Sequence, residues 1–219
     1  MLKFSERTCS WNQMMLSPKT TAALHAKRNE LGFLDGLENF GTPVLITYLP
    51  LLLLALVLSG NLEPIYLSAV IFSLAATTLG IFLVSLIFSL MALMVASSLG
   101  GKAQFERLYY MTSLAAAPTF VFTVVINIAV LLIKSIMRSV SFSFAAIDAL
   151  QMMGDLVAIS VTIYGFYLLT ISINALYMFG RAKSVATWLI PAIIIFAAGA
   201  AFLLTDIFGV FKFLVKTLL

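Results

Sequence analysis

The sequence contains only one cysteine, Cys9, and one histidine, His25, among its 219 residues. A lone cysteine cannot form an intrachain disulfide or a thiolate metal site. A zinc cluster would need more nitrogen and sulfur ligands than this chain supplies. His25 stands beside Lys27 and Arg28 in a segment expected at the surface, so we expect a solvated imidazole and no histidine-based triad. The sequence therefore predicts neither a metal site nor a cofactor.

Catalytic motifs are also missing. The sequence contains no His-Glu-x-x-His, no Gly-x-Ser-x-Gly, no Walker loop and no pair of intramembrane aspartates. Each of these motifs places a nucleophile, a base or a phosphate cradle at a fixed spacing, and nothing else in the chain supplies such a spacing. We expect no catalytic residues, and a protein that is not an enzyme.

Charge is scarce as well. Charged residues make up 10% of the chain and hydrophobic residues 62%, with a mean hydropathy of +1.10, whereas a soluble domain is about 25% charged and about 45–50% apolar. So few polar side chains could not cover a water-exposed surface, which indicates that lipid is the solvent. The net charge is +4. The basic residues are scattered rather than arranged in a stripe, so no nucleic-acid partner is expected.

Long apolar segments predict an all-α fold: a polytopic integral membrane helix bundle of five transmembrane helices with flanking amphipathic interfacial helices. A spanning helix needs about 20 apolar residues. The five predicted spans are Pro43–Ser59, Ser73–Ser98, Thr112–Ile133, Leu156–Phe179 and Thr187–Asp206. Residues Ile65–Phe72 either lie along the interface or extend the second helix.

The Lys and Arg side chains are distributed unevenly about these spans. Nine of the thirteen fall on the side of the amino terminus: Lys3, Arg7, Lys19, Lys27, Arg28, Lys102, Arg107, Arg181 and Lys183. The other side carries Lys134, Arg138, Lys212 and Lys216. Because positive loops stay in the cytoplasm, we expect a cytoplasmic amino terminus and an extracellular or lumenal carboxyl terminus, in the cell membrane if the chain is prokaryotic.

The stretch "SSLGGKAQFERL" interrupts the apolar sequence after the second span. Its two glycines can end a helix, since glycine tolerates the left-handed conformation, and its basic residues hold the loop in the cytoplasm. We expect Phe105, Leu108 and Tyr109 to offer an apolar face to lipid headgroups. The alternative is a simple topological anchor. The candidate interaction turn consists of Gly100, Gly101, Lys102, Phe105, Arg107 and Tyr109.

Amphipathic segments flank the predicted spans. We divide the chain into a flexible cytoplasmic amino terminus (1–16), a cytoplasmic amphipathic segment (17–41), the five-span domain (42–206) and an amphipathic outer-face tail (207–219). The segment Lys19–Asp35 has the periodicity of a helix. The segment Ser135–Asp155 is too polar to cross the membrane and too apolar to leave it, so we expect a helix on the outer surface.

Uncharged polar residues recur within the predicted spans, at Asn127, Tyr167, Thr170, Asn174 and Tyr177. One explanation is contact between helices, where such hydrogen bonds contribute about 0.6 kcal/mol each. The other is a polar path or a lipid-headgroup cavity between spans three and four. The aspartates expected nearest to the membrane lie at or beyond its outer boundary, which argues against ion-coupled transport.

Three segments resemble a known family: "SPKTTAALHAKRNELGFLDGLENFGTPVLI" (Ser17–Ile46), "GGKAQFERLYYMTSLAAAPTF" (Gly100–Phe120) and "YGFYLLTISINALYMFGRAKSVATWLI" (Tyr164–Ile190). Over about Met15 to Asp206 the chain resembles the Yip-domain family of Ypt/Rab-interacting five-span membrane proteins, most closely its prokaryotic-type branch. The resemblance implies a cytoplasmic amino terminus, five spans and no known catalytic activity. Eukaryotic relatives are associated with prenylated Rab-type GTPases, membrane curvature and vesicle traffic.

The chain departs from the eukaryotic relatives before the first span. Their Asp-Leu-Tyr-Gly-Pro motif is absent, and "LGFLDGLENFGTP" stands in its place, so the resemblance does not carry GTPase binding over to this chain. The leading hypothesis is a non-enzymatic membrane scaffold or adaptor. Its expected partners are membrane lipids and a membrane protein, which could be a second copy of the chain. The alternative hypothesis is a small permease or channel component that uses the polar residues named above.

Overall fold

The structure, a computed structural model, describes residues 4–27, 32–43, 64–102, 104–140 and 143–218. In these ranges every regular element is a helix, which confirms the predicted all-α class. The elements are α1 (Phe4–Leu16), α2 (Pro18–Lys27), a helical stretch at 33–43, α4 (Pro64–Ser98), α5 (Phe105–Ser139), α6 (Phe144–Tyr177) and α7 (Arg181–Leu218). Within the predicted amino-terminal segment 1–16, Phe4–Leu16 form α1.

Four helices in the described part of the chain are long and apolar enough to cross a membrane, over Thr78–Ser98, Phe105–Lys134, Phe144–Tyr177 and Arg181–Ala201. The chain is therefore built as a multi-pass membrane protein. These four segments match the second to fifth predicted spans. The first predicted span, Pro43–Ser59, lies almost wholly outside the described residues.

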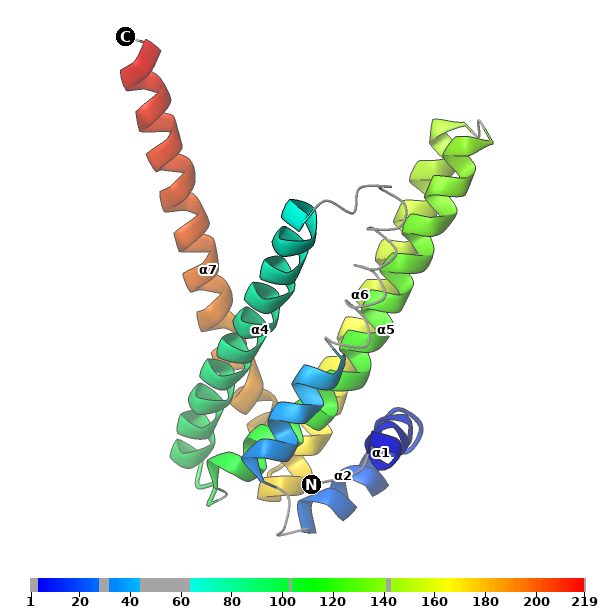
Figure 1. Ribbon diagram of the computed structural model, residues 1–219. Helices are drawn as coiled ribbons and strands as arrows, with labels where there is room; N and C mark the ends of the chain where they lie inside the picture. The colour runs from blue at the N-terminus through cyan, green and yellow to red at the C-terminus, as the bar shows by residue number, and fades with distance from the viewer. Residues whose placement is uncertain (1–3, 28–31, 44–63, 103, 141–142, 219) are drawn as a thin grey trace.

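The long helices alternate in direction (Figure 1). Helix α4 runs toward the end of the molecule where the amino terminus lies, α5 returns, α6 runs back and α7 ends at the opposite side. The connections after α4 and after α6 therefore lie at the same end as α1 and α2. The carboxyl terminus lies at the other end.

The helices pack in two pairs, α5 with α6 and α4 with α7, which diverge from a common base (Figure 1). Glycines bring the first pair together. A Cβ atom on Gly154 would come within 2.6 Å of a methyl group of Val130, and one on Gly165 within 3.0 Å of Thr119. Small residues of this kind allow membrane helices to approach closely where no hydrophobic effect drives them together.

The core lies at the base, around the first turns of α5. All side chains from Leu108 to Ala115 are buried. They contact α1, α2, the helical stretch at 33–43, α4 and α6. At about 1.5 Å per residue the 35 residues of α5 extend about 52 Å, well beyond the roughly 30 Å of a hydrocarbon core. The start of α5 is thus covered by protein rather than by lipid.

Three expectations about helix limits are corrected or resolved. Residues Ile65–Phe72 belong to α4. The segment Ser135–Asp155 is not a separate surface helix, because it forms the end of α5 and the start of α6. A hydrogen bond joins the two helices here, from Lys134 Nζ to Gln151 Oε1 at 2.9 Å, and within α6 Gln151 Nε2 donates to Asp155 Oδ1 at 2.8 Å. The backbone of the predicted tail at 207–219 continues α7 without a break as far as Leu218.

Candidate functional site

The cap, defined here as α1, α2 and the helical stretch at 33–43, covers the start of α5. A chain of hydrogen bonds joins its parts. Trp11 Nε1 donates to Asn39 Oδ1 at 3.3 Å, and Asn39 Nδ2 donates to Ser113 Oγ at 3.3 Å. The Ser113 hydroxyl in turn donates to the Tyr110 carbonyl at 2.7 Å. All three polar side chains are buried, so their polar atoms are satisfied inside the protein, as low-dielectric surroundings require.

Helix α2 is held by two further contacts with α5. The Tyr110 hydroxyl lies 2.8 Å from His25 Nδ1, and Arg107 Nη2 donates to the carbonyl of Ala26 in the last turn of α2. His25 is buried, with 7% of its surface exposed, so the expectation of a solvated imidazole is wrong. Its neighbour Ala22 is also buried, and this apolar face of α2 faces the bundle rather than water.

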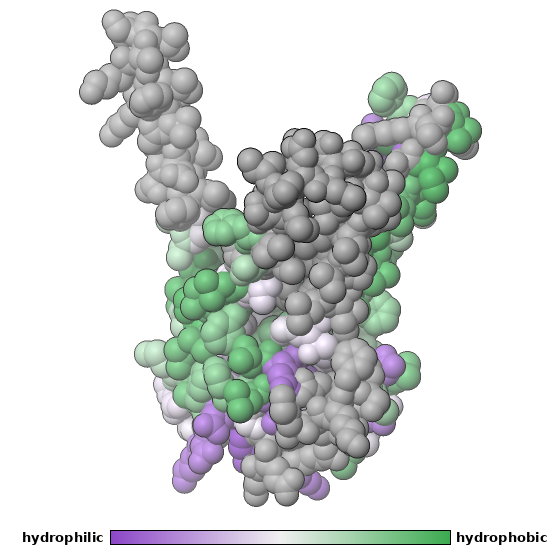
Figure 2. Space-filling model, viewed as in Figure 1, coloured by the Kyte–Doolittle hydropathy of each residue, from purple (hydrophilic) through white to green (hydrophobic). Residues whose placement is uncertain are grey.

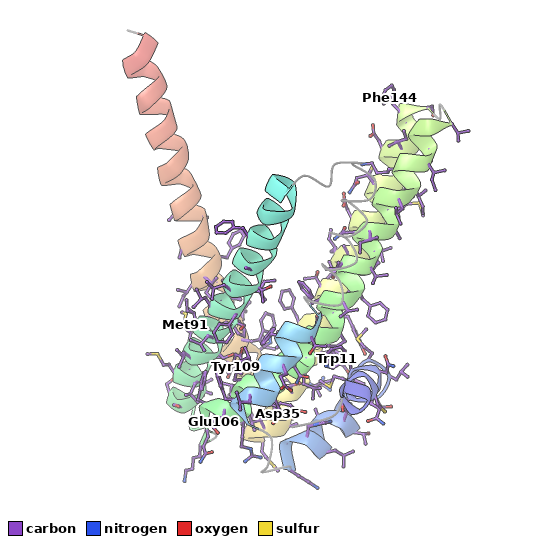
Figure 3. All side chains as sticks on the ribbon, in the orientation of Figure 1. Trp11, Asp35, Met91, Glu106, Tyr109 and Phe144 are labelled. Atoms are coloured by element: carbon purple, nitrogen blue, oxygen red, sulfur yellow. The ribbon has the colours of Figure 1, made fainter. Side chains whose placement is uncertain are left out.

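An aromatic cluster connects the stretch 33–43 with α4 and α5 (Figure 3). The ring centroid of Tyr109 lies 5.0 Å from that of Phe33, 5.6 Å from Phe40 and 5.8 Å from Phe105. The Tyr109 hydroxyl lies 3.2 Å from Ser85 Oγ on α4. Tyr109 and Leu108 are fully buried. The expectation that they face lipid headgroups is therefore wrong. The cap packs on Tyr109, and Leu108 packs in a cluster with Ala92, Ile173 and Trp188 of α4, α6 and α7.

The turn between α4 and α5 has the geometry that its glycines predict. Gly100 has φ of 93°, and the Gly101 amide donates to the Ala96 carbonyl at 2.8 Å. A Cβ atom on Gly101 would come within 2.6 Å of the Tyr177 ring. The turn thus packs against the end of α6. Lys183 at the start of α7 closes the arrangement by donating to the Leu99 carbonyl at 3.2 Å.

The outer surface of this end combines basic and apolar side chains. Hydrophilic residues gather there, and hydrophobic residues cover the helices above (Figure 2). Exposed basic side chains come from α2, from the turn and from the start of α7: Lys19, Lys27, Lys102, Arg181 and Lys183. Exposed leucines accompany them at Leu16, Leu24 and Leu34, with 84%, 58% and 68% of their surfaces accessible. We call this set of eight residues the cap surface.

The polar residues predicted within the spans do not converge on one cavity. Asn127 and Tyr167 are exposed on the outside of α5 and α6. The Asn174 amide donates to the Phe179 carbonyl at the end of α6. Thr170 accepts a hydrogen bond of 2.9 Å from Trp188 Nε1, and Tyr177 packs on Gly101. These contacts hold helix ends and helix pairs together.

Sequence patterns did not reveal the residues that attach the cap, namely Trp11, His25, Asn39, Tyr110 and Ser113. Asn39 and Ser113 are 74 positions apart, and His25 and Tyr110 are 85 apart. The one available signal was the presence of polar residues inside apolar stretches. In the described part of the chain no group of three or more His, Cys, Asp or Glu residues is placed to hold a metal ion.

Comparison with known proteins gives one match. The family described as the Yip1 domain matches residues 14–203, a range that includes most of the cap and all four described spans. No curated protein and no solved structure matches the chain.

Proposed function

The chain belongs to the Yip1 domain family, and on that basis we propose that it is a non-enzymatic membrane scaffold or adaptor. It acts through its cap surface, which faces the cytoplasm and contacts lipid headgroups and a protein partner. The membrane domain has five spans, with Pro43–Ser59 as the first, and the carboxyl terminus lies on the outer side.

The observation that carries this proposal is the cap surface itself. Its five basic side chains are exposed at one end of the bundle, on α2, on the turn and at the start of α7. The contact of His25 with Tyr110 holds α2 to α5, and the hydrogen bond from Lys183 to the Leu99 carbonyl holds the start of α7 to the turn. Each Lys or Arg near an anionic membrane surface contributes about 1 kcal/mol of attraction. Positive residues also favour the cytoplasmic side. Both effects support a cytoplasmic cap next to anionic lipid.

A test of the lipid contact removes four of the five charges and keeps Lys183, which donates to the Leu99 carbonyl. The variant Lys19→Gln, Lys27→Gln, Lys102→Gln, Arg181→Gln is compared with the matched control Lys212→Gln, Lys216→Gln, whose changes lie at the opposite end of α7. Native mass spectrometry of protein released from mixed anionic and zwitterionic nanodiscs measures the retained lipid. We expect the first variant to lose the enrichment in anionic lipid and the control to keep it. Equal retention in both variants would contradict the proposal.

The protein contact is tested through the exposed leucines. The double variant Leu24→Asn, Leu34→Asn is cross-linked in native membranes and then isolated by affinity. The control is Thr20→Asn, because the Thr20 side chain is also exposed on α2. The leucine variant is expected to lose a partner that both the parent protein and the control retain. A set of co-isolated proteins unaffected by the leucines would count against an adaptor acting through this surface.

A further inference from the structure

A cavity of about 590 Å³ lies where the two helix pairs diverge, between α4, α5, α6 and α7. Small side chains leave this space open. They come from α4 (Gly80 and Ser85), from α5 (Ala116) and from α7 (Ala192). A Cβ atom on Gly80 would meet nothing within 4 Å. A volume of this size is typical of sites for small organic ligands, which have about 300–1,000 Å³.

The residues that line the cavity follow one face of α4 and one face of α7. On α4 its lining residues run from Gly80 to Phe88 along one face, a length of about 12 Å at 1.5 Å per residue. On α7, Ala192 and Phe196 stand one turn apart on the face that lines it. Apart from Phe40, every lining residue belongs to one of the four candidate membrane spans.

Water is a poor occupant of this space. The walls are apolar except for two hydroxyls, and both already have protein partners. Ser85 Oγ donates to the Phe82 carbonyl at 2.8 Å and lies 3.2 Å from the Tyr109 hydroxyl. Thr112 Oγ1 donates to the Tyr109 carbonyl at 2.9 Å and lies 3.2 Å from Ser89 Oγ. A buried water needs two to four polar partners, and a cavity without them stays dry.

The rim opens to the surface that lipid would cover. Phe196 is 79% exposed and Val84 is 52% exposed, and the neighbouring Ile193 and Ile194 are also exposed. At this depth the medium outside the protein is hydrocarbon. We propose that the cavity is a binding site for one acyl chain of a bilayer glycerolipid, which enters laterally past Phe196. The site is separate from the cap surface, so the inference goes beyond the proposed function and does not depend on it.

Photolabelling tests this site in the full-length protein. Proteoliposomes of phosphatidylcholine that contain a phosphatidylcholine with a diazirine in one acyl chain are irradiated, and the labelled residues are mapped by mass spectrometry. We expect labelling of the inner walls at Phe88 and Ala116 as well as of the outer residues Ile193 and Ile194. The variant Ala192→Phe fills the cavity and is expected to reduce labelling of the inner walls several-fold without changing that of the outer residues.

Two further variants keep the result interpretable. Gly80→Leu fills the cavity from α4, where the space beside Gly80 is open, and is expected to reproduce the effect if Ala192→Phe fails to fold. Ala197→Phe, on the exposed face of α7, is the matched control and should leave labelling unchanged. Labelling confined to the outer residues, or inner labelling that persists in both filled variants, overturns the proposal.

Discussion

Gly36 lies so close to Tyr109 that a Cβ atom on the glycine would come within 2.6 Å of the ring carbon Cδ1. The glycine belongs to the helical stretch at 33–43 and the tyrosine to the buried start of α5. The tyrosine ring also contacts Phe33 and Phe40. It cannot move away without disturbing both phenylalanines. This contact therefore makes the cap and α5 one packed unit.

The substitution Gly36→Ala is expected to destabilise the protein by about 1–3 kcal/mol, the usual cost of forcing an extra methyl group into a packed core. Gly41→Ala in the same helical stretch is the matched control, because its Cβ atom would meet nothing within 4 Å. The control should be neutral or stabilising by up to about 1 kcal/mol, through the reduced entropy of the unfolded chain. Thermal unfolding in detergent measures both. Equal destabilisation by the two changes would show that the contact with Tyr109 does not matter.

Asn39 is predicted to be the residue on which the polar contacts of the cap depend. Asn39→Ala removes the hydrogen bonds to Trp11 and Ser113 inside a buried region, at an expected cost of about 1–3 kcal/mol. Asn12→Ala is the control, since Asn12 is exposed on α1. Denaturant unfolding followed by tryptophan fluorescence would report the loss, because Trp11 is itself in the network. A normal unfolding midpoint for Asn39→Ala would rule out this role.

The contact between Gly154 of α6 and Val130 of α5 can be tested with a second substitution that makes room for the first. Gly154→Ala places a methyl group 2.6 Å from Val130 and should weaken the pair, whereas the double variant Gly154→Ala, Val130→Ala should recover much of the loss. A double-mutant cycle of unfolding free energies is expected to give a coupling of about 0.5–3 kcal/mol, as for residues in direct contact. Additive effects would mean that the two residues do not touch in the membrane.

Arg107 is predicted to hold α2 against the bundle through the Ala26 carbonyl. In Arg107→Gln the end of α2 should open more often, so the amide hydrogens of residues 19–27 should exchange faster with solvent. Arg181→Gln, which changes an exposed arginine at the same end of the molecule, should leave exchange in α2 unchanged. If the amides of α2 exchange at the same rate in both variants, Arg107 does not hold α2 and serves only to keep the loop in the cytoplasm.

Composition and local signals were enough to predict the all-α class and the approximate positions of the four spans that the structure describes. The apolar run ending at Ser98 and the Gly100–Gly101 turn predicted where α4 stops, since only glycine readily adopts the left-handed conformation found at Gly100. Whether lipid or protein covers the start of a helix could not be predicted in this way. Leu108 and Tyr109 are equally apolar whether lipid or protein covers them, so hydropathy alone placed them against headgroups.

The contacts of the cap could not be predicted from periodicity, for a different reason. A helix pattern relates residues three or four positions apart, whereas His25 meets Tyr110 across 85 positions. Nothing in the sequence around either residue specifies the other. The same limit applies to Ser135–Asp155, whose mixture of polar and apolar residues predicted a surface helix. The hydrogen bonds of Gln151 with Lys134 and Asp155 allow the two helices to continue instead.

The orientation of the capped end is the point on which the account rests most heavily, and cysteine labelling in intact cells tests it directly. Cys9 is the only cysteine and is exposed, so Cys9→Ser gives a clean background for Lys102→Cys and Lys216→Cys. A maleimide that cannot cross the membrane should label position 216 in intact cells and position 102 only after permeabilisation. Labelling of both positions from one side would contradict the three spans that separate them. Labelling of position 102 alone in intact cells would place the cap outside the cell.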